Sequence, residues 1–94
     1  MAYEVSYSDV SVEQLKNLRA VDRTAILTQV ERVLMVNPTM ESKARVKQLR
    51  QPAPTQFRLR VGEFRVFYDV ELETVQIVQI LSKAEAISYL EEPS

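Results

Sequence analysis

The sequence has no cysteine and no histidine among its 94 residues. Without cysteine, neither a disulfide framework nor a thiolate metal site can form. Without histidine, the chain also lacks the commonest metal ligand and the commonest general base of proteins. A metal centre would need a cluster of carboxylates, and the basic stretch 43–65 contains Glu63 alone. We therefore expect no metal and no cofactor.

Two further absences bear on where the protein works. The sequence has no apolar run long enough to cross a membrane and no signal-peptide pattern. The default expectation is therefore the cytoplasm, without a membrane partner. Ninety-four residues predict one small domain, 1–94, near the lower size limit for a self-sufficient core.

The net charge of −1 conceals an uneven distribution along the chain. Residues 1–42 carry four cations against six carboxylates, a balance of −2, and residues 66–94 carry one against six, a balance of −5. Between them, residues 43–65 carry seven cations against one carboxylate, a balance of +6. A basic middle in a nearly neutral chain favours a local anion site over non-specific coating of nucleic acid.

The clearest structural signal is the segment 56–70, QFRLRVGEFRVFYDV. Apolar and polar residues alternate on both sides of Gly62-Glu63, which predicts a β-hairpin with a II′ turn because glycine supplies the positive φ at the first turn position. This turn fixes the register and places Arg60 opposite Arg65 and Arg58 opposite Phe67. One face of the hairpin is then apolar, and the other carries three arginines around Phe67.

Helical and extended patterns occupy the rest of the chain. Tyr3 to Tyr7 alternates as a short strand, Ser11 and Gln14 form a capping-box pattern for a first helix, and Asp22 is the expected N-cap of a second. A short strand is expected within 44–50, and 75–81 reads as a strand buried on both faces. Ser82 and Glu85 form a further capping box before a terminal helix. The expected fold class is α+β, with an antiparallel helical hairpin on one face of a small, mostly antiparallel sheet and a short C-terminal helix.

Arg58, Arg60 and Arg65 project from the sheet face opposite the helices in this arrangement. Like charges directly opposite one another destabilise a sheet, so an internal carboxylate or an external anion is expected to relieve the repulsion. Arginine binds phosphate and carboxylate equally well. The alternative is a solvated face whose charges have no further role.

Five features together resemble the RelE/ParE superfamily of toxins from bacterial type II toxin–antitoxin pairs. They are KQLR at 47–50, FRLRVGEFRVFYDV at 57–70, VQIVQIL at 75–81, Lys83 and Tyr89. The resemblance spans nearly the whole chain and implies a RelE/ParE-like fold. It also implies a cognate antitoxin as partner, with acidic side chains that pair with the arginines. The superfamily contains ribosome-dependent messenger-RNA endonucleases, like RelE, and DNA gyrase inhibitors, like ParE.

The resemblance to RelE-like enzymes also assigns site residues. The first of the two family lysines on the strand before the turn falls on Gln56, which is a departure, and the second falls on Arg58. Arg65 matches the arginine after the turn, Lys83 stands in place of a later arginine, and Tyr89 takes the position of the terminal tyrosine. Arg58, Arg65, Lys83 and Tyr89 are thus the catalytic candidates. Lys47, Arg50, Arg60 and Phe67 are the candidates for binding RNA and phosphate.

Attack by a ribose 2′-hydroxyl requires a proton acceptor, stabilisation of the phosphorane charge and help for the leaving oxygen. Arginine supplies the second but is a poor base, which leaves Lys83 for proton transfer and Tyr89 for orienting or stacking on a base.

Structural alternatives remain open for each candidate. Lys83 can be an ordinary exposed lysine and Tyr89 an anchor for the tail. Phe67 can be covered by the tail, and Lys47 and Arg50 can simply solvate an edge strand. For the whole protein we therefore expect a RelE-like endoribonuclease that inhibits translation. The alternatives are a ParE-like gyrase inhibitor and a catalytically degenerate binding module.

Overall fold

The structure is a computed structural model that describes residues 2–91. Its elements, in chain order, are β1 (Glu4–Tyr7), α1 (Asp9–Lys16), α2 (Ala20–Gln29), the π-helical turn η1 (Val30–Leu34), β2 (Val46–Gln48), β3 (Phe57–Val61), β4 (Phe64–Glu71), β5 (Thr74–Ser82) and α3 (Lys83–Glu91). Within these residues, no helix has both the length and the apolar character needed to cross a bilayer.

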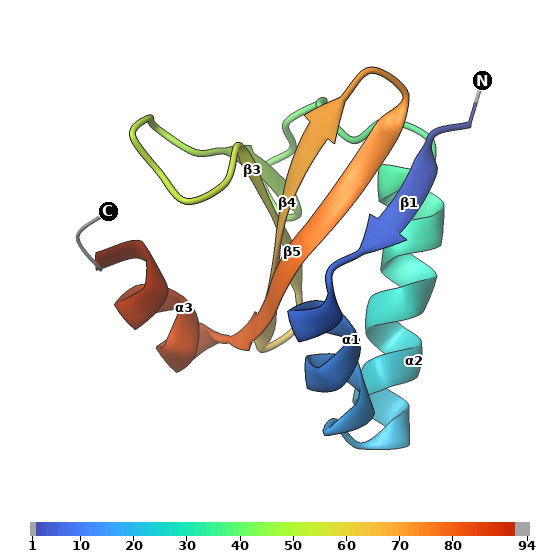
Figure 1. Ribbon diagram of the computed structural model, residues 1–94, viewed down its shortest axis with the longest axis vertical. Coiled ribbons are helices and arrows are strands. Elements are labelled where there is room, and N and C mark those ends of the chain that lie inside the picture. The colour runs from blue at the N-terminus through green and yellow to red at the C-terminus, as the bar shows by residue number, and fades with distance from the viewer. Residues whose placement is uncertain (1, 92–94) are drawn as a thin grey trace.

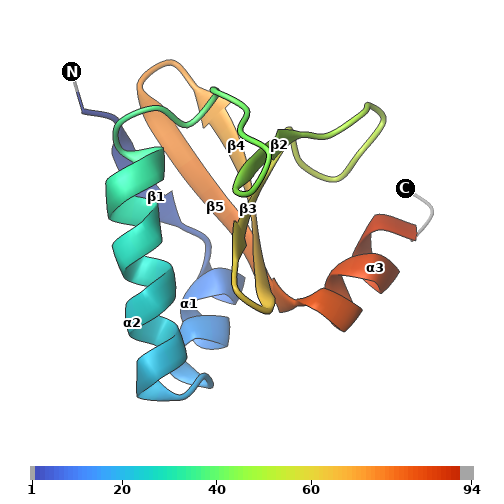
Figure 2. The same ribbon diagram turned by 180° about the vertical axis from the view of Figure 1, so that it is seen from behind.

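The five strands form one sheet in the order β1-β5-β4-β3-β2. β1 runs parallel to β5, and all other neighbours are antiparallel, so the expected mostly antiparallel sheet is confirmed. α1 and α2 lie on one face of the sheet and α3 lies on the other, as the two opposite views show (Figures 1 and 2). The fold is thus α+β, as predicted, with the C-terminal helix placed on the face that carries the arginines.

The central hairpin forms with the predicted register. Val61 pairs with Phe64, and the pairing continues down the ladder to Phe57 opposite Tyr68. Gly62 has a φ of 55°, which is the positive angle that the turn demands. The rings of Phe57 and Tyr68 stack across the two strands with centroids 5.5 Å apart. The two-residue turn therefore fixes the register of the whole hairpin.

The main core lies between this hairpin and the helices α1 and α2. Ile26 and Leu34 from the helices meet Leu59, Val66 and Tyr68 from the sheet, and all five are fully buried. The Tyr68 hydroxyl donates a 2.6 Å hydrogen bond to the carbonyl of Pro38. Burial of this phenol raises its pKa well above the ordinary range, so Tyr68 is neutral and donates its hydrogen bond inside the core.

The predicted caps of the first two helices are wrong. Ser8, not Ser11, is the N-cap of α1, and its hydroxyl accepts a hydrogen bond from the Ser11 amide. α2 begins after Arg19, and Asp22 lies in its first turn, where it accepts a 3.2 Å bond from the Arg19 side chain. Both helices therefore start earlier than the polar motifs indicate.

Gln14 has a tertiary partner that explains the first error. Its side-chain oxygen accepts a 2.6 Å bond from the Ile80 amide, and its nitrogen donates 2.7 Å to the side chain of Gln79. Ser8 likewise donates 2.8 Å to the carbonyl of Val78. β1 ends at Tyr7, so these side chains satisfy backbone groups of β5 beyond the end of its partner strand.

β5 contains a bulge that changes which face its side chains occupy. Phe67 of β4 pairs with Gln79 and Tyr68 pairs with Ile77, so Val78 has no partner in β4. Ile77 and Ile80 consequently both join the main core, while Leu81 joins a second cluster on the opposite face. α1 and α3 both contact β5, so the prediction of a strand buried on both faces is confirmed, and the bulge explains its mixed pattern.

Candidate functional site: a basic face beside the C-terminal helix

Two cross-strand rows form the face of the sheet opposite α1 and α2. The first row runs Lys47, Arg58, Phe67 and Gln79, and the second runs Arg60, Arg65 and Leu81. Side chains directly opposite one another in a sheet share a face. The register therefore brings three arginines and Lys47 together on one surface, which we call the basic face.

The arginines of the basic face are close enough to affect one another. The pKa of Arg58 is lowered, mainly by burial and then by the charges of Arg65 and Arg60. The pKa of Arg65 is lowered by burial and by Arg60, and Glu63 opposes this shift. Among residues 2–91 the ion pairs join Lys16 to Glu13 and Arg19 to Asp22, so no carboxylate there pairs with the three arginines. The mutual repulsion expected from the sequence is therefore present, and no ion pair among residues 2–91 relieves it.

Arg65 is held more tightly than the other two arginines. Its side chain is buried, with 7% of the residue exposed. Its Nη1 donates to the carbonyls of Gly62 and Phe64, both at 2.9 Å. The guanidinium thus fastens the hairpin turn through one of its nitrogens. Arg58 is half-buried and Arg60 is exposed, so the three differ in freedom although they share a face.

Phe67 lies in the centre of the basic face, beneath α3. It is completely buried and packs with Leu81 and Ala86, with Leu49 and Tyr89 at the margin of the cluster. The ring of Tyr89 meets Phe67 edge-on, with centroids 5.0 Å apart, and Tyr89 keeps part of its surface exposed. In this arrangement the tail covers Phe67, and contact between Phe67 and a ligand would require α3 to move.

Lys83 stands at the junction between β5 and α3, beside the hairpin turn. Its backbone amide donates 2.9 Å to the carbonyl of Glu63, and its side chain is exposed. The predicted capping box fixes this junction, since the Ser82 amide donates to Glu85 and the Glu85 amide donates to Ser82. Hydrogen bonds from the backbone and the side chain of Ser82 lower the pKa of the Glu85 carboxylate below its ordinary value. Lys83 therefore lies at one end of the basic face.

The two remaining sequence candidates flank the site. Lys47 is exposed in β2 and stands opposite Arg58, while Arg50 is exposed just after β2. The structure thus gathers Arg58, Arg60, Arg65 and Lys47 on one surface, with Lys83 and Tyr89 at its α3 side. Sequence reasoning missed the bonds from Arg65 to the turn, because no local pattern shows that a strand arginine folds back onto its own hairpin.

The chemistry of this face is that of an anion site. In the part of the chain from 2 to 91, no three Asp or Glu side chains gather as a metal site would need. Arginines with lowered pKa values still remain cationic at neutral pH and present several N–H donors suited to phosphate oxygens. The face therefore presents donors suited to an anionic ligand, whether phosphate or carboxylate.

Comparison with solved structures identifies the fold. No family model and no curated protein matches the sequence. Solved structures do match it. The RelE–RelB complex of Pyrococcus horikoshii gives a TM-score of 0.71 at 23% identity, covering 88% of this chain and 97% of that one.

Two bacterial structures agree with this result. A double mutant of the Escherichia coli toxin RelE in the free state gives a TM-score of 0.71 at 17% identity, covering 96% of this chain and 95% of that one. A RelBE toxin–antitoxin complex of Mycobacterium tuberculosis gives 0.69 at 20% identity, covering 87% of this chain and 99% of that one. The chain has the fold of RelE toxins, which confirms the sequence resemblance at the level of fold.

Proposed function

We propose that this protein is the toxin of a type II toxin–antitoxin pair and that it cleaves messenger RNA on the ribosome, in the cytoplasm. The observation that carries the proposal is the basic face. Arg58, Arg60 and Arg65 lie together without a carboxylate partner from residues 2–91. They do so on a fold shared with RelE toxins.

The arginines suit the charge that develops during cleavage. Attack of a 2′-hydroxyl on the adjacent phosphate produces a pentavalent phosphorane with additional negative charge, which preorganised cations stabilise more than the ground state. Arg65 is preorganised by its bonds to the turn, and Arg58 is partly desolvated. We assign these two to the phosphorane, and Arg60, Lys47 and Arg50 to phosphates on either side.

Proton transfer and base positioning fall to the α3 side of the face. The bond from the Lys83 amide to the Glu63 carbonyl holds the first turn of α3 against the hairpin, and we assign proton transfer to the Lys83 amine. The Tyr89 ring, supported from behind by Phe67, is the surface on which an RNA base stacks. Phe67 then acts by positioning Tyr89. The ribosome supplies the in-line geometry that this small site does not impose by itself.

The fold also bears on the alternatives. The neighbours described above are RelE toxins, two of them as complexes with RelB, which favours an endoribonuclease and a protein antitoxin over a gyrase inhibitor. We expect a cognate antitoxin encoded beside this chain.

Expression in bacteria followed by mapping of transcript ends tests the proposal. The wild-type protein should halt growth and create new 5′ ends inside translated regions, and Arg58→Ala should abolish both effects at an equal protein level. Halted growth with intact messages and trapped gyrase–DNA complexes would replace the ribonuclease with a gyrase inhibitor. Unaffected growth would instead support the third alternative, a catalytically degenerate protein that acts only as a binding module.

A further inference from the structure

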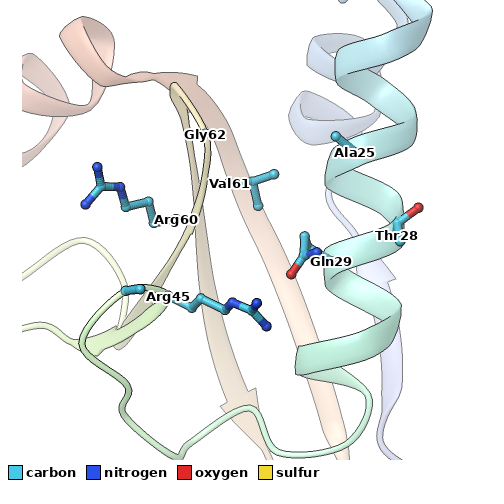
Figure 3. A pocket seen from close by; sticks show the side chains of 8 residues that line it. Ala25, Thr28, Gln29, Arg45, Arg60, Val61 and Gly62 are labelled. Carbon is cyan, nitrogen blue, oxygen red and sulfur yellow. The ribbon is translucent and has the colours of Figure 1, made fainter.

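Gln79 is the member of the first row of the basic face that has no part in the proposed cleavage chemistry. It lies directly opposite Phe67 in the ladder between β4 and β5. Figure 3 shows how alternate residues of β3 divide between the two faces of the sheet, since Arg60 points away from α2 and Val61 points toward it. By the strand register, Gln79 belongs to the side of Arg60, away from α2.

The bulge in β5 turns Gln79 to this face. Ile77 pairs with Tyr68 and faces the main core, and regular alternation would return the side chain two residues later, that of Gln79, to the core as well. Because Val78 is unpaired, Gln79 takes the next position on the opposite face. Bulges recur beside functional sites, where they re-aim a side chain. The side chain that is re-aimed here is an amide in the same cross-strand row as Arg58.

Two hydrogen bonds fix which end of the Gln79 amide faces outward. The Ile80 amide can only donate, so the Gln14 atom that meets it at 2.6 Å is the side-chain oxygen. The other end of the Gln14 amide is then its nitrogen, which donates a 2.7 Å bond to the Gln79 side-chain oxygen. Gln79 therefore presents its nitrogen, with two N–H donors, on the side away from Gln14.

The Gln79 nitrogen is open to a ligand. It has no hydrogen-bond acceptor among residues 2–91, and no buried side-chain nitrogen or oxygen in that part of the chain lacks a partner. Solvent therefore reaches this nitrogen, although the side chain as a whole is half-buried. The Ile80 amide needs only Gln14 as its acceptor, so the further bond from Gln14 to Gln79 is not required to satisfy the backbone of β5.

A nucleotide held at the arginines can reach this amide. Arg58 and Gln79 flank Phe67 in the first row, so their backbones are two strand spacings, or roughly 10 Å, apart. A nucleotide spans a similar distance from its phosphate to the outer edge of its base. Tyr89, on which we expect a base to stack, contacts the same Phe67 ring. The donors of Gln79 therefore lie where the edge of a base is expected.

We propose that Gln79 reads a base of the RNA and selects one that presents a keto oxygen, uracil or guanine, over one that presents an amino group in its place, cytosine or adenine. The two N–H groups of Gln79 donate to a keto oxygen, whereas its own oxygen is engaged by Gln14 and faces away from an amino group. Single-stranded bases are commonly recognised by hydrogen bonds to such edges. Gln79 is then the specificity-determining residue and Gln14 a positioning residue. The inference rests on the proposed function for the class of ligand alone.

An NMR titration of the full chain with short oligonucleotides tests this base recognition. Oligouridine and oligocytidine are matched probes, because uracil carries a keto oxygen where cytosine carries an amino group. We expect oligouridine to bind about five- to tenfold more tightly and to shift the side-chain amide signals of Gln79, which oligocytidine should leave in place. Equal affinity for the two probes, or binding of neither, would overturn the inference.

Substitution of Gln14 gives the sharpest variant, because it changes the recognition without altering residue 79. In Gln14→Glu, one carboxylate oxygen still accepts from the Ile80 amide and the other faces Gln79 as a second acceptor. The Gln79 amide then turns its nitrogen toward residue 14 and presents its oxygen, so the preference should reverse to oligocytidine. Gln79→Glu, which presents acceptors alone, should reverse the preference as well.

Gln76→Glu is the matched control for the added charge. Gln76 lies in the same strand opposite Asp69, on the same side of the sheet as Gln79, and takes no part in the chain of bonds from Ile80. This variant should keep the preference for oligouridine. The inference is overturned if Gln76→Glu loses that preference or if Gln14→Glu retains it. The titration measures binding and not cleavage, so its failure leaves the proposed ribonuclease standing, and intact transcripts in the growth experiment would leave the base recognition standing.

Discussion

The two faces of the sheet are built from alternate residues of the same strands and have opposite surroundings. On one face Leu59, Val66 and Tyr68 are fully buried beneath α1 and α2. On the other, Arg58 is half-buried and Arg60 exposed, and α3 covers only the small cluster around Phe67. The face beneath α1 and α2 supplies most of the hydrophobic stabilisation. The basic face can therefore hold repelling charges near one another. Substitutions on the first face should mainly lower stability, and those on the basic face should mainly lower activity.

The largest effect is expected from two neighbouring positions of β3. Leu59→Ala should lower the free energy of unfolding by about 2–5 kcal/mol, because it leaves a cavity in a fully buried site. Arg58→Ala should change stability by less than about 1 kcal/mol and reduce transcript cleavage about 10²–10³-fold through loss of phosphorane stabilisation. Urea unfolding and cleavage on ribosomes measure the two quantities. Equal losses of stability in both variants would contradict the division between the faces.

Substitution of Arg65, unlike that of Arg58, should lower both stability and activity. Arg65→Ala removes two hydrogen bonds to turn carbonyls as well as a site charge, so it should cost about 1–3 kcal/mol of stability and also abolish cleavage. Arg65→Lys should recover part of the stability and little activity, because lysine lacks the planar fork. Unfolding curves of both variants, compared with that of Arg58→Ala, test this. Wild-type stability in Arg65→Ala would mean that the turn bonds contribute nothing.

The two hairpin turns offer a finer comparison. Gly62 and Leu72 both adopt a φ of 55°, but Leu72 carries a side chain that is 89% exposed. Leu72→Gly should stabilise the protein by about 0.5–1 kcal/mol, because the strained conformation is relieved and almost no buried surface is lost. Glu73→Gly, at the next turn position, is the control and should destabilise. Thermal unfolding of both variants would show whether the second turn is strained.

The smallest effect concerns the start of α3 and depends on pH. Hydrogen bonds from Ser82 lower the pKa of Glu85 in the folded protein, so the ionised carboxylate stabilises the fold above its ordinary pKa. That contribution is lost as the pH falls through the lowered value. Glu85→Gln should cost about 0.5 kcal/mol at pH 7, and the difference from wild type should vanish in acid. Urea unfolding of wild type and Glu85→Gln across pH measures this difference, and a difference that persists in acid would contradict the expectation.

The sequence predicts those features of the fold that depend on interactions between neighbouring residues. The hairpin register and the Ser82–Glu85 capping box depend on neighbouring residues alone, and both form as expected. The cap of α1 differs from the expected one because Gln14 bonds to β5, 66 residues away, instead of to its own helix. In α2, Asp22 accepts a bond from the Arg19 side chain and lies inside the first turn. The basic face follows from strand alternation, whereas the burial of Phe67 under α3 depends on tertiary packing that no short motif records.

The unpaired Val78 has a consequence for the whole C-terminal third of the chain. If Val78 instead paired regularly with Phe67, every later side chain of β5 would turn to the opposite side. Gln79 would exchange places with the apolar residue after it, and Leu81 would leave the cluster that anchors Tyr89. α3 would then begin from the wrong side of the sheet. The bulge at Val78 therefore decides on which side of the sheet α3 lies, and with it Lys83 and Tyr89.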